Sequence, residues 1–351
     1  MKKNRFLFLA GFLALAVLFP FSAFAGGQAA KGPAGEEDLN YVVKIARSVT
    51  NGLCSAPLFI AEALGYYEEE GLKWEAVFQS SGDAQMNITT GKTDVTTGLI
   101  ATTIMPVVNG YDVKIPLGIH TGCSKILVRG DSGITDIFQL IGKKVGTSSL
   151  NGSGVILLQR TLGEAGYKIL PPNADFDLVV FQSSDLPLAI SNGSVDAVIM
   201  GEPTATVAEE EQGLKVIFDS ALSEWYREEF CCVLLLRSGF ADEHPQVAAK
   251  FTRAIQKASA YVQENPLKTT ELMAEKQYVA GDPVRNAAIL ATYNYKASVS
   301  QARIAISRNL IEMKRVGIIP SDVDVDPDEL TNRLFVQLPG VPDSLYDWIG
   351  K

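Results

Sequence analysis

Four short polar turns carry the side chains in this sequence that are best suited to bind a small solute. They lie at residues 51–56, 80–83, 148–154 and 183–185; each contains serine and each precedes a segment with helical spacing of apolar residues. Free amides at a helix N-terminus attract anions, and serine hydroxyls can add hydrogen bonds. A hydrogen bond involving a charged group contributes about 1.5–3 kcal/mol, and micromolar binding needs about 8 kcal/mol, so a handful of such bonds suffices. For any single serine, helix capping is an equally good interpretation.

One pair of residues, His120 and Cys123, has the types of a catalytic base and nucleophile. A Cys/His dyad needs a third group that orients the histidine, and the sequence identifies none. The Gly152-Ser153-Gly154 segment lacks the spacing of a nucleophile elbow, and neither a phosphate loop nor a complete dinucleotide fingerprint is present. We therefore expect a binding protein rather than an enzyme, with no catalytic residue and no cofactor.

The four cysteines are Cys54, Cys123, Cys231 and Cys232. Cys54 and Cys123 each follow an apolar run that predicts a strand, so they can form a disulfide if those strands are neighbours. Cys231 and Cys232 are adjacent and should point to opposite faces of a strand, as ordinary buried thiols. A metal site would need ligands at regular spacing, and the sequence has none, so no metal is expected.

Composition excludes some functions and suggests the number of lobes. The 351 residues carry a net charge of −9 and contain no basic cluster, which argues against nucleic-acid binding. A chain of this length suits two lobes better than one core.

The N-terminal 25 residues have the pattern of a secretory signal peptide. A basic start is followed by the apolar run 6–19 and by Ala23-Phe24-Ala25, a small-x-small cleavage site. The alternative, an uncleaved anchor, is disfavoured because the run is short for a membrane span of about 20 residues. No cysteine follows the cleavage site, so a lipoprotein is not expected. We expect cleavage after Ala25, a flexible leader over 26–39, and no stable membrane insertion.

The same order of elements is predicted twice after residue 40, which indicates an α/β fold. Strands are expected at 42–46, 74–78 and 113–120, then at 144–146 and 178–181; helices are expected at 57–64 and 84–90, then at 155–162 and 186–191. Gly91-x-x-Asp94 and Gly193-x-x-Asp196 occupy matching places, as do Ser80-Ser81 and Ser183-Ser184. We expect two lobes of one topology, although α/β segments can resemble each other by chance.

The lobes are expected to be joined by two apolar runs, 126–128 and 233–236. Lobe I is then predicted as 40–125 with 232–351, and lobe II as 126–231. Helices are expected at 246–264, 267–277, 283–295 and 300–315. Asp326 should cap a last helix that begins at Pro327, which explains the acidic tail better than a calcium loop does.

Several motifs in this order resemble one family. They are APLFIAEALGYYEEEGL (56–72), GKTDV (91–95), LVR with SGI (127–134), LIGKKVG (140–146), NGSVDA (192–197), Glu202-Pro203, and Phe240 with His244-Pro245. Over roughly 41–275 the chain resembles the solute-binding proteins of nitrate/sulfonate/taurine-type ABC transporters, which are related to the NMT1/THI5-like group.

The resemblance implies a type II periplasmic binding protein fold, α/β, with two lobes of parallel-dominated sheets joined by two hinge strands. It implies a monomer in the periplasm that binds a small polar or anionic organic solute, such as a sulfonate, taurine or nitrate, and delivers it to a permease and its ATPase. By position, the ligand site should include Cys54, Ser55, Ala56, Ser80, Ser81, Thr102, His120, Thr121, Ser148, Ser149, Ser183, Gly201 and Glu202.

Two charged residues have open roles. Arg47 could reach an anionic ligand or form a structural ion pair; Glu202 could bind an amine or cap a helix. The chain departs from many family members at Met200-Gly201, where an aromatic residue often precedes the acidic-Pro pair, and the His120-Thr121-Gly122-Cys123 turn is distinctive. An alternative function is that of an enzyme of the thiamin-pyrimidine synthase branch. Cys231-Cys232 resembles in part the cysteine-rich run of that branch. A third possible function is that of a ligand sensor that docks on a receptor.

Overall fold

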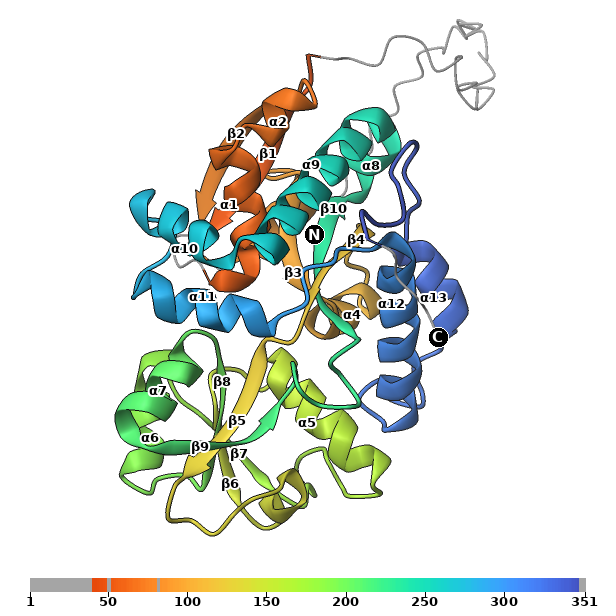
Figure 1. Cartoon of the computed structure of the whole chain (residues 1–351). Coiled ribbons are helices and arrows are strands. Elements are labelled where there is room, and N and C mark those ends of the chain that lie inside the picture. Colours follow the sequence, from red (N-terminus) through yellow and green to blue (C-terminus); the bar gives the residue numbers. More distant parts are fainter. Residues whose placement is uncertain (1–39, 49–51, 81–82, 347–351) are drawn as a thin grey trace, which may run out of the picture. The chain divides into compact units, whose positions relative to one another are not determined.

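The computed structural model describes residues 40–48, 52–80 and 83–346. The predicted signal peptide and leader, and the predicted ligand residue Ser81, lie outside these ranges. Residues 38–351 belong to one compact unit, which contains two five-stranded sheets (Figure 1).

The first sheet has the strand order β2-β1-β3-β10-β4. Its strands are β1 (Val42–Ser48), β2 (Lys73–Gln79), β3 (Val95–Leu99), β4 (Val113–Thr121) and β10 (Phe230–Arg237). β1 is parallel to β2 and β3, whereas β10 is antiparallel to both β3 and β4. The helices packed around it include α1 (Ala56–Ala63), α2 (Tyr66–Glu69), α3 (Ala84–Thr89), α4 (Ile100–Val108), α8 (Ser238–Glu243), α9 (Pro245–Glu264), α12 (Val299–Arg315) and α13 (Pro327–Leu334).

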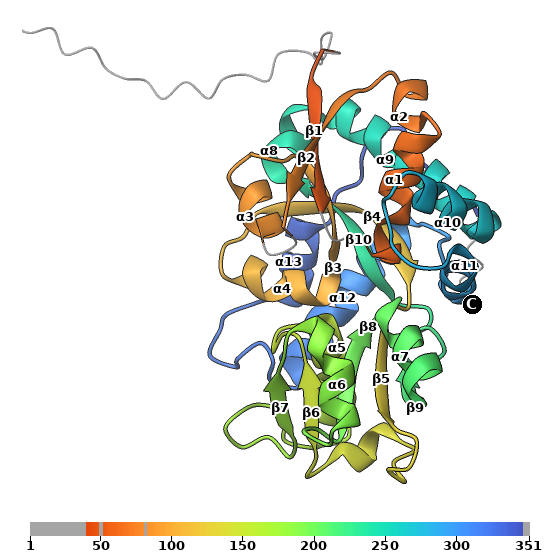
Figure 2. The ribbon, with the colours of Figure 1, turned by 90° about the vertical axis from the view of Figure 1, so that its left-hand side faces the viewer.

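The second sheet has the order β7-β6-β8-β5-β9. Its strands are β5 (Ser124–Arg129), β6 (Lys144–Thr147), β7 (Asp177–Val180), β8 (Ala197–Gly201) and β9 (Leu214–Asp219), with helices α5 (Ser153–Glu164), α6 (Leu186–Ser191) and α7 (Thr204–Gln212) around them (Figure 2). The strands β6, β7, β8 and β9 occupy the places that β1, β2, β3 and β4 occupy in the first sheet, and β5 occupies the place of β10. The two sheets therefore have the same order, as the repeated motifs predicted. In each sheet four of the five strands run in the same direction, as predicted, and one reversed strand, β10 in the first sheet and β5 in the second, makes both antiparallel pairings.

The two Gly-x-x-Asp motifs make equivalent bonds in the two sheets. Asp94 accepts a hydrogen bond from the amide of Lys44 at 3.1 Å and donates its own amide to the Lys44 carbonyl at 2.8 Å. Asp196 does the same with Lys144, at 2.9 and 2.8 Å. Each motif therefore ties the turn before the third parallel strand to the start of the first, which is why the motif recurs.

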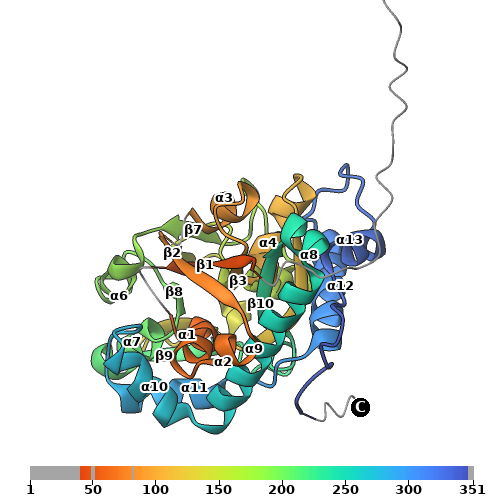
Figure 3. The same cartoon turned by 90° about the horizontal axis from the view of Figure 1, so that it is seen from above.

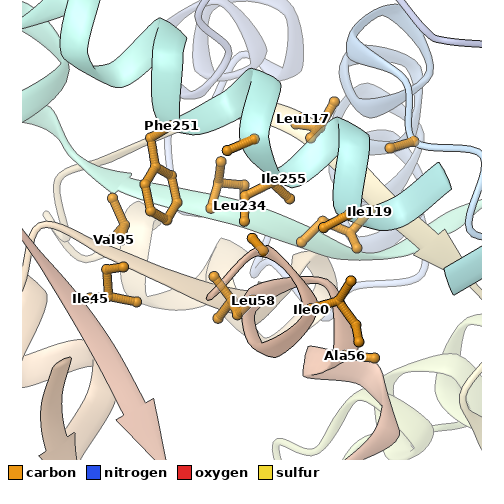
Figure 4. Close-up of a cluster of buried hydrophobic side chains, with 14 of the residues drawn as sticks. Ile45, Ala56, Leu58, Ile60, Val95, Leu117, Ile119, Leu234, Phe251 and Ile255 are labelled. Carbon is orange, nitrogen blue, oxygen red and sulfur yellow. The ribbon is translucent and has the colours of Figure 1, made fainter. Parts of the chain in front are cut away.

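The buried cores lie on both faces of each sheet. On β10, Leu234 and Leu236 point to the core that contains α1 and α9, and Val233 and Leu235 to the core that contains α4 and α12. Figure 3 shows α1 and α9 on one side of the first sheet and α4 on the other. Figure 4 shows Ile45, Leu58, Leu234 and Phe251 meeting in the first of these cores.

The C-terminal helices follow the predicted order. The remaining ones are α10 (Pro266–Glu275) and α11 (Pro283–Thr292). α9 begins at Pro245, as the His244-Pro245 pair indicated, and the Asp326 side chain accepts hydrogen bonds from the amides of Asp328 and Glu329 at the start of α13. Among the described residues, no helix combines the length and hydropathy needed to cross a bilayer.

Candidate functional site between the two sheets

The chain passes between the sheets twice. The first crossing is the two residues between β4 and β5, Gly122 and Cys123; the second runs over 220–229, between β9 and β10. Gly122 has φ +71°, and a β-carbon built on it would lie 2.5 Å from Cα of Ala221. Glycine is needed here both for the left-handed backbone and for the contact between the crossings.

A pocket lies around these two crossings. It is lined by Ile100, Ala101, Gly122, Cys123, Ser124, Ser153, Leu157, Arg160, Ser220, Tyr226, Glu229, Phe230, Cys231 and Asn309. These residues come from the start of α4, from α5 and α12, from both crossings and from the first residues of β5 and β10, so the pocket is bordered by elements of both sheets. The Ser220 hydroxyl accepts hydrogen bonds from the amides of Cys123 and Ser124, at 2.9 and 3.0 Å, and so joins one crossing to the other.

Arg160 is the charged centre of this pocket. Its side chain is 2% exposed and makes paired hydrogen bonds to Glu229, at 2.7 and 2.9 Å, and a further one to Glu312 through Nε at 2.9 Å. Burial by itself lowers the pKa of Arg160, but the bonds to Glu229 outweigh it and the net shift is upward. Arg308 adds a second cation near Glu229 and Glu312, so two cations balance two carboxylates. These residues are suited to holding α5, α12 and the second crossing together.

Sequence reasoning missed Arg160, Glu229 and Asn309. A usable signal was present for Arg160, because it is the one charged residue of the predicted helix 155–162 and follows the apolar run 155–158. The sequence held no such signal for its partners, because Glu229 and Asn309 are distant from Arg160 in sequence and only the fold brings them together.

The turns at the ends of β1 and β8, one from each sheet, approach each other. A β-carbon built on Gly52 would lie 4.0 Å from the carbonyl oxygen of Glu202. In the first of these turns, Ser55 occupies the N-cap position of α1 but its hydroxyl lies 3.2 Å from that of Thr97, on β3, instead of capping the helix. A hydroxyl from the turn after β1 thus meets one from the middle of its parallel neighbour β3, close to the carboxyl edge where ligands bind in such sheets.

The two charged residues with open roles have structural partners. Arg47 forms an ion pair with Glu62, and its guanidinium lies over the rings of Phe59 and Tyr278, at 4.7 and 5.2 Å. The side chain therefore makes the structural ion pair that was one of its two predicted roles, and a ligand role for Arg47 stays a prediction.

Glu202 is likewise engaged. Its carboxylate pairs with Lys125 at 2.7 Å and accepts hydrogen bonds from the amide and hydroxyl of Thr206, at 3.0 and 2.8 Å. It therefore helps to hold the start of α7, as the capping alternative predicted, and an amine-binding role for Glu202 stays a prediction.

The other predicted ligand residues differ in exposure, and two of them, Cys54 and Thr102, are half-buried. Ala56, His120 and Thr121 are buried, whereas Ser80, Ser148, Ser149, Ser183 and Gly201 are exposed. The Ser80 hydroxyl donates to Asp83, and the Thr102 hydroxyl donates to the Leu99 carbonyl within α4. Of all the predicted ligand and disulfide residues, Cys123 lines the pocket described above.

The cysteines differ from expectation in two ways. All four are free thiols, so the predicted Cys54–Cys123 bond is not formed in this structure. The strand register is irregular between Phe230 and Val233, because Phe230 pairs with Thr121 and Cys232 with His120, which leaves Cys231 as an extra residue. This β-bulge removes the regular alternation of side chains, and the sulfurs of Cys231 and Cys232 lie 3.8 Å apart instead of on opposite faces.

Two α/β halves with the same strand order, joined by two crossings beside a pocket, define a periplasmic binding protein fold. The periplasmic aliphatic sulphonate binding protein SsuA from Escherichia coli shares it, with a TM-score of 0.67 and 18% identity over 85% of this chain and 94% of that chain. The periplasmic nitrate-binding protein NrtA from Synechocystis PCC 6803 has a TM-score of 0.67 and 15% identity over 84% of this chain and 86% of that chain. At such identities the likeness shows the fold alone.

The family model described as NMT1/THI5 like matches residues 54–269, and the chain belongs to this family. Its relatives include a protein named putative aliphatic sulfonates-binding protein from Bacillus subtilis (strain 168), which is 28% identical over 63% of this chain and 66% of its own length. They also include a 4-amino-5-hydroxymethyl-2-methylpyrimidine phosphate synthase from Aspergillus parasiticus, which is 25% identical over 76% of this chain and 80% of that protein.

Proposed function

We propose that this chain is the exported solute-binding component of an ABC importer. Residues 1–25 direct it to the periplasm, and residues 40–125 with 232–351 and residues 126–231 form two lobes that close on a small polar or anionic organic solute of the sulfonate, taurine or nitrate type. The solute is then delivered to a membrane permease with its ATPase. The observation that carries this proposal is the pair of equivalent sheets whose strand-end turns, at Gly52 and Glu202, approach each other within one family-typical fold.

The hydroxyl pair of Ser55 and Thr97 is the proposed contact for the solute. Ser55 immediately precedes α1 in the turn after β1, and Thr97 lies on the neighbouring parallel strand β3. Hydrogen bonds to an anionic group from such donors contribute about 1.5–3 kcal/mol each, equivalent to roughly a tenfold or larger change in affinity per bond.

A ligand screen tests the proposal. Native mass spectrometry of the mature protein would be followed by thermal melts with sulfonates, taurine, nitrate, bicarbonate, pyrimidines and aromatic carboxylates. A ligand at 100 times its dissociation constant should stabilise the fold by about 2.7 kcal/mol. Ser55→Ala should weaken its binding at least tenfold, while Ser191→Ala, whose hydroxyl bonds within α6 and to Gln212, should not. If a solute binds and Ser55→Ala leaves its affinity unchanged, this placement of the ligand is refuted.

Lobe closure can be measured independently. Arg285 on α11 pairs with Glu210 and Glu211 on α7, at 2.8 and 3.5 Å, so an ion pair already spans the two halves. A bound solute should make small-angle scattering profiles more compact. Unchanged compactness with a ligand proven to bind would contradict a clamp mechanism.

A second candidate function is an enzyme related to the pyrimidine phosphate synthases, favoured by the relatives that carry this name. Incubation of the purified protein with a bound pyrimidine or other ligand, followed by mass analysis, separates the two. Release of the ligand unchanged supports a binding protein, and a chemically altered product supports the enzyme.

A further inference from the structure

Five side chains with sulfur or nitrogen donors gather beside the two crossings. One ring nitrogen of His120 and the sulfurs of Cys54 and Cys232 lie within 4.8 Å of one another, and so do the sulfurs of Cys123, Cys231 and Cys232. Cys232 belongs to both groups. The donors come from the end of β1, the end of β4, the first crossing and the bulge of β10, which explains why sequence spacing gave no metal signal.

The distances are those of a site for a small thiolate-binding ion. Four ligands at about 2.3 Å from a tetrahedral metal are about 3.8 Å from one another. The sulfurs of Cys231 and Cys232 are 3.8 Å apart, which matches this separation. The sulfurs of Cys123 and Cys231, at 3.1 Å, would need to move apart by several tenths of an ångström when they bind the ion.

His120 provides a separate indication that this region binds a ligand. Its side chain is 0% exposed, and its Nδ1 lies 3.2 Å from the Thr121 carbonyl, which can only accept a hydrogen bond. Nδ1 therefore carries the proton, and Nε2 has a lone pair. Nε2 is buried and has no hydrogen-bond partner among the described residues. A histidine whose one nitrogen donates to a backbone carbonyl while the other is left to accept is arranged as metal-binding histidines are.

The ring is also fixed in place by aromatic contacts. It stacks on Tyr293, with centroids 5.1 Å apart and planes inclined by 2°, and contacts Tyr295 at 4.7 Å. Such packing restricts the orientation of the imidazole, as a preorganised ligand requires.

We propose that Cys123, Cys231 and Cys232, with His120 or Cys54 as the fourth ligand, bind one thiolate-preferring d¹⁰ metal ion, Zn²⁺ or Cu⁺. Thiolates are the ligands that select these ions over Mg²⁺ or Ca²⁺. Each coordinating thiol loses its proton to solvent on binding. Cys123 and Cys231 line the pocket between the sheets, which provides a route of entry. This site is independent of the proposed organic solute, because it uses a different donor set.

The test uses the mature protein, fully reduced and kept under anaerobic conditions. Zn²⁺ is titrated in competition with a chromophoric chelator, and Cu⁺ in competition with a Cu⁺-specific chelator. The ion that binds more tightly is the one that the site takes. We expect one ion per chain. Co²⁺ in place of Zn²⁺ should give the absorption of a tetrahedral thiolate site, and His120→Asn or Cys54→Ser should change that spectrum, depending on which supplies the fourth ligand.

Variants decide whether these residues form the site. Cys232→Ser should lower the affinity for the metal ion at least tenfold. Cys231→Ala, made as a separate variant, should do the same. His244→Asn is the matched control, because His244 is the chain's other histidine and stacks on Tyr41 instead, at 4.0 Å. Circular dichroism of each apo variant shows whether it is folded.

Two results would overturn the proposal. One is a reduced wild-type protein that binds neither ion more tightly than folded Cys232→Ser does. The other is a Cys123–Cys231 disulfide, found by peptide mapping of protein isolated from the export compartment without reductant, since oxidised sulfurs cannot coordinate as thiolates. Neither result bears on the organic solute, so failure here leaves the proposed function standing.

Discussion

Arg160 and Glu229 are joined by two parallel hydrogen bonds, Nη1 to Oε1 at 2.7 Å and Nη2 to Oε2 at 2.9 Å. Arg160 belongs to α5 of the second half, and Glu229 ends the segment that returns the chain to the first sheet. This buried pair therefore couples a helix of one half to the crossing between them.

Replacing the buried cation should be costly. Arg160→Met leaves Glu229 buried without its main partner, and loss of one member of a buried pair costs about 3–5 kcal/mol. Arg315→Met is the control, because Arg315 forms an exposed pair with Glu164 at 2.6 Å, and exposed pairs contribute about 0–1 kcal/mol. Urea unfolding of both variants gives the comparison. Equal losses would show that Arg160 does not act as a buried ion pair.

Acid should weaken the same network. Burial raises the pKa of Glu312, but the charges and hydrogen bonds of Arg160 and Arg308 outweigh it and hold this pKa below its ordinary value. A carboxyl whose pKa is depressed in the folded state stabilises the fold above its unfolded pKa, and this stability is lost as pH falls through the lower, folded value. Wild type should therefore exceed Glu312→Gln in stability at pH 7.

The Glu312 effect is checked by chemical denaturation at a series of pH values. The gap between wild type and Glu312→Gln should narrow from about pH 5 downward, because the wild-type carboxyl then becomes protonated. A gap that stays constant to pH 3 would contradict this assignment.

The repeated aspartates offer an internal comparison. Asp94 is buried and also pairs with Arg237 at 2.7 Å, whereas Asp196 makes the equivalent amide bonds at a half-buried position. We expect Asp94→Ala to cost about 3–5 kcal/mol. Asp196→Ala should cost about 1.5–3 kcal/mol, since it loses hydrogen bonds to a charged group without a buried ion pair. Equilibrium denaturation measures both, and a larger loss at Asp196 would reverse the proposed ranking.

Gly122 should tolerate no side chain. Gly122→Ala brings a methyl group against the backbone of Ala221 and also forces alanine into the left-handed region. Gly133→Ala is matched, because Gly133 has φ +72° and no atom within 4 Å of an added β-carbon. The left-handed conformation costs both variants about 1–2 kcal/mol, and overpacking adds about 1–3 kcal/mol at Gly122 alone. If thermal melts show equal losses of stability for the two variants, the two crossings can move apart at Gly122 without a loss of stability.

Local patterns predicted most of the fold because they report local physics. Pro245 and Pro266 mark helix starts, Asp326 caps α13, and the alternation of apolar runs with helical spacing gave the order of the strands and helices. The two Gly-x-x-Asp motifs indicated a repeated topology, because each is bonded to the start of a strand in its own half.

The candidate site was less predictable because its parts come from distant segments. Arg47 and Glu202 each had two open roles in the sequence, and their partners Glu62 and Lys125 are set by packing. The adjacent cysteines were expected on opposite faces, and a bulge whose pairing depends on β4 brings them together.

The sequence by itself determined the α/β elements, the internal repeat, the helix caps and the family, since these depend on neighbouring residues and on motif order. Only the tertiary structure decided which charges neutralise one another and which donors share a space. Arg160 meets Glu229, and Cys54 and His120 meet Cys232, across separations of tens to hundreds of residues. Such contacts depend on strand register and on the two crossings between the sheets, which no local pattern of residues encodes.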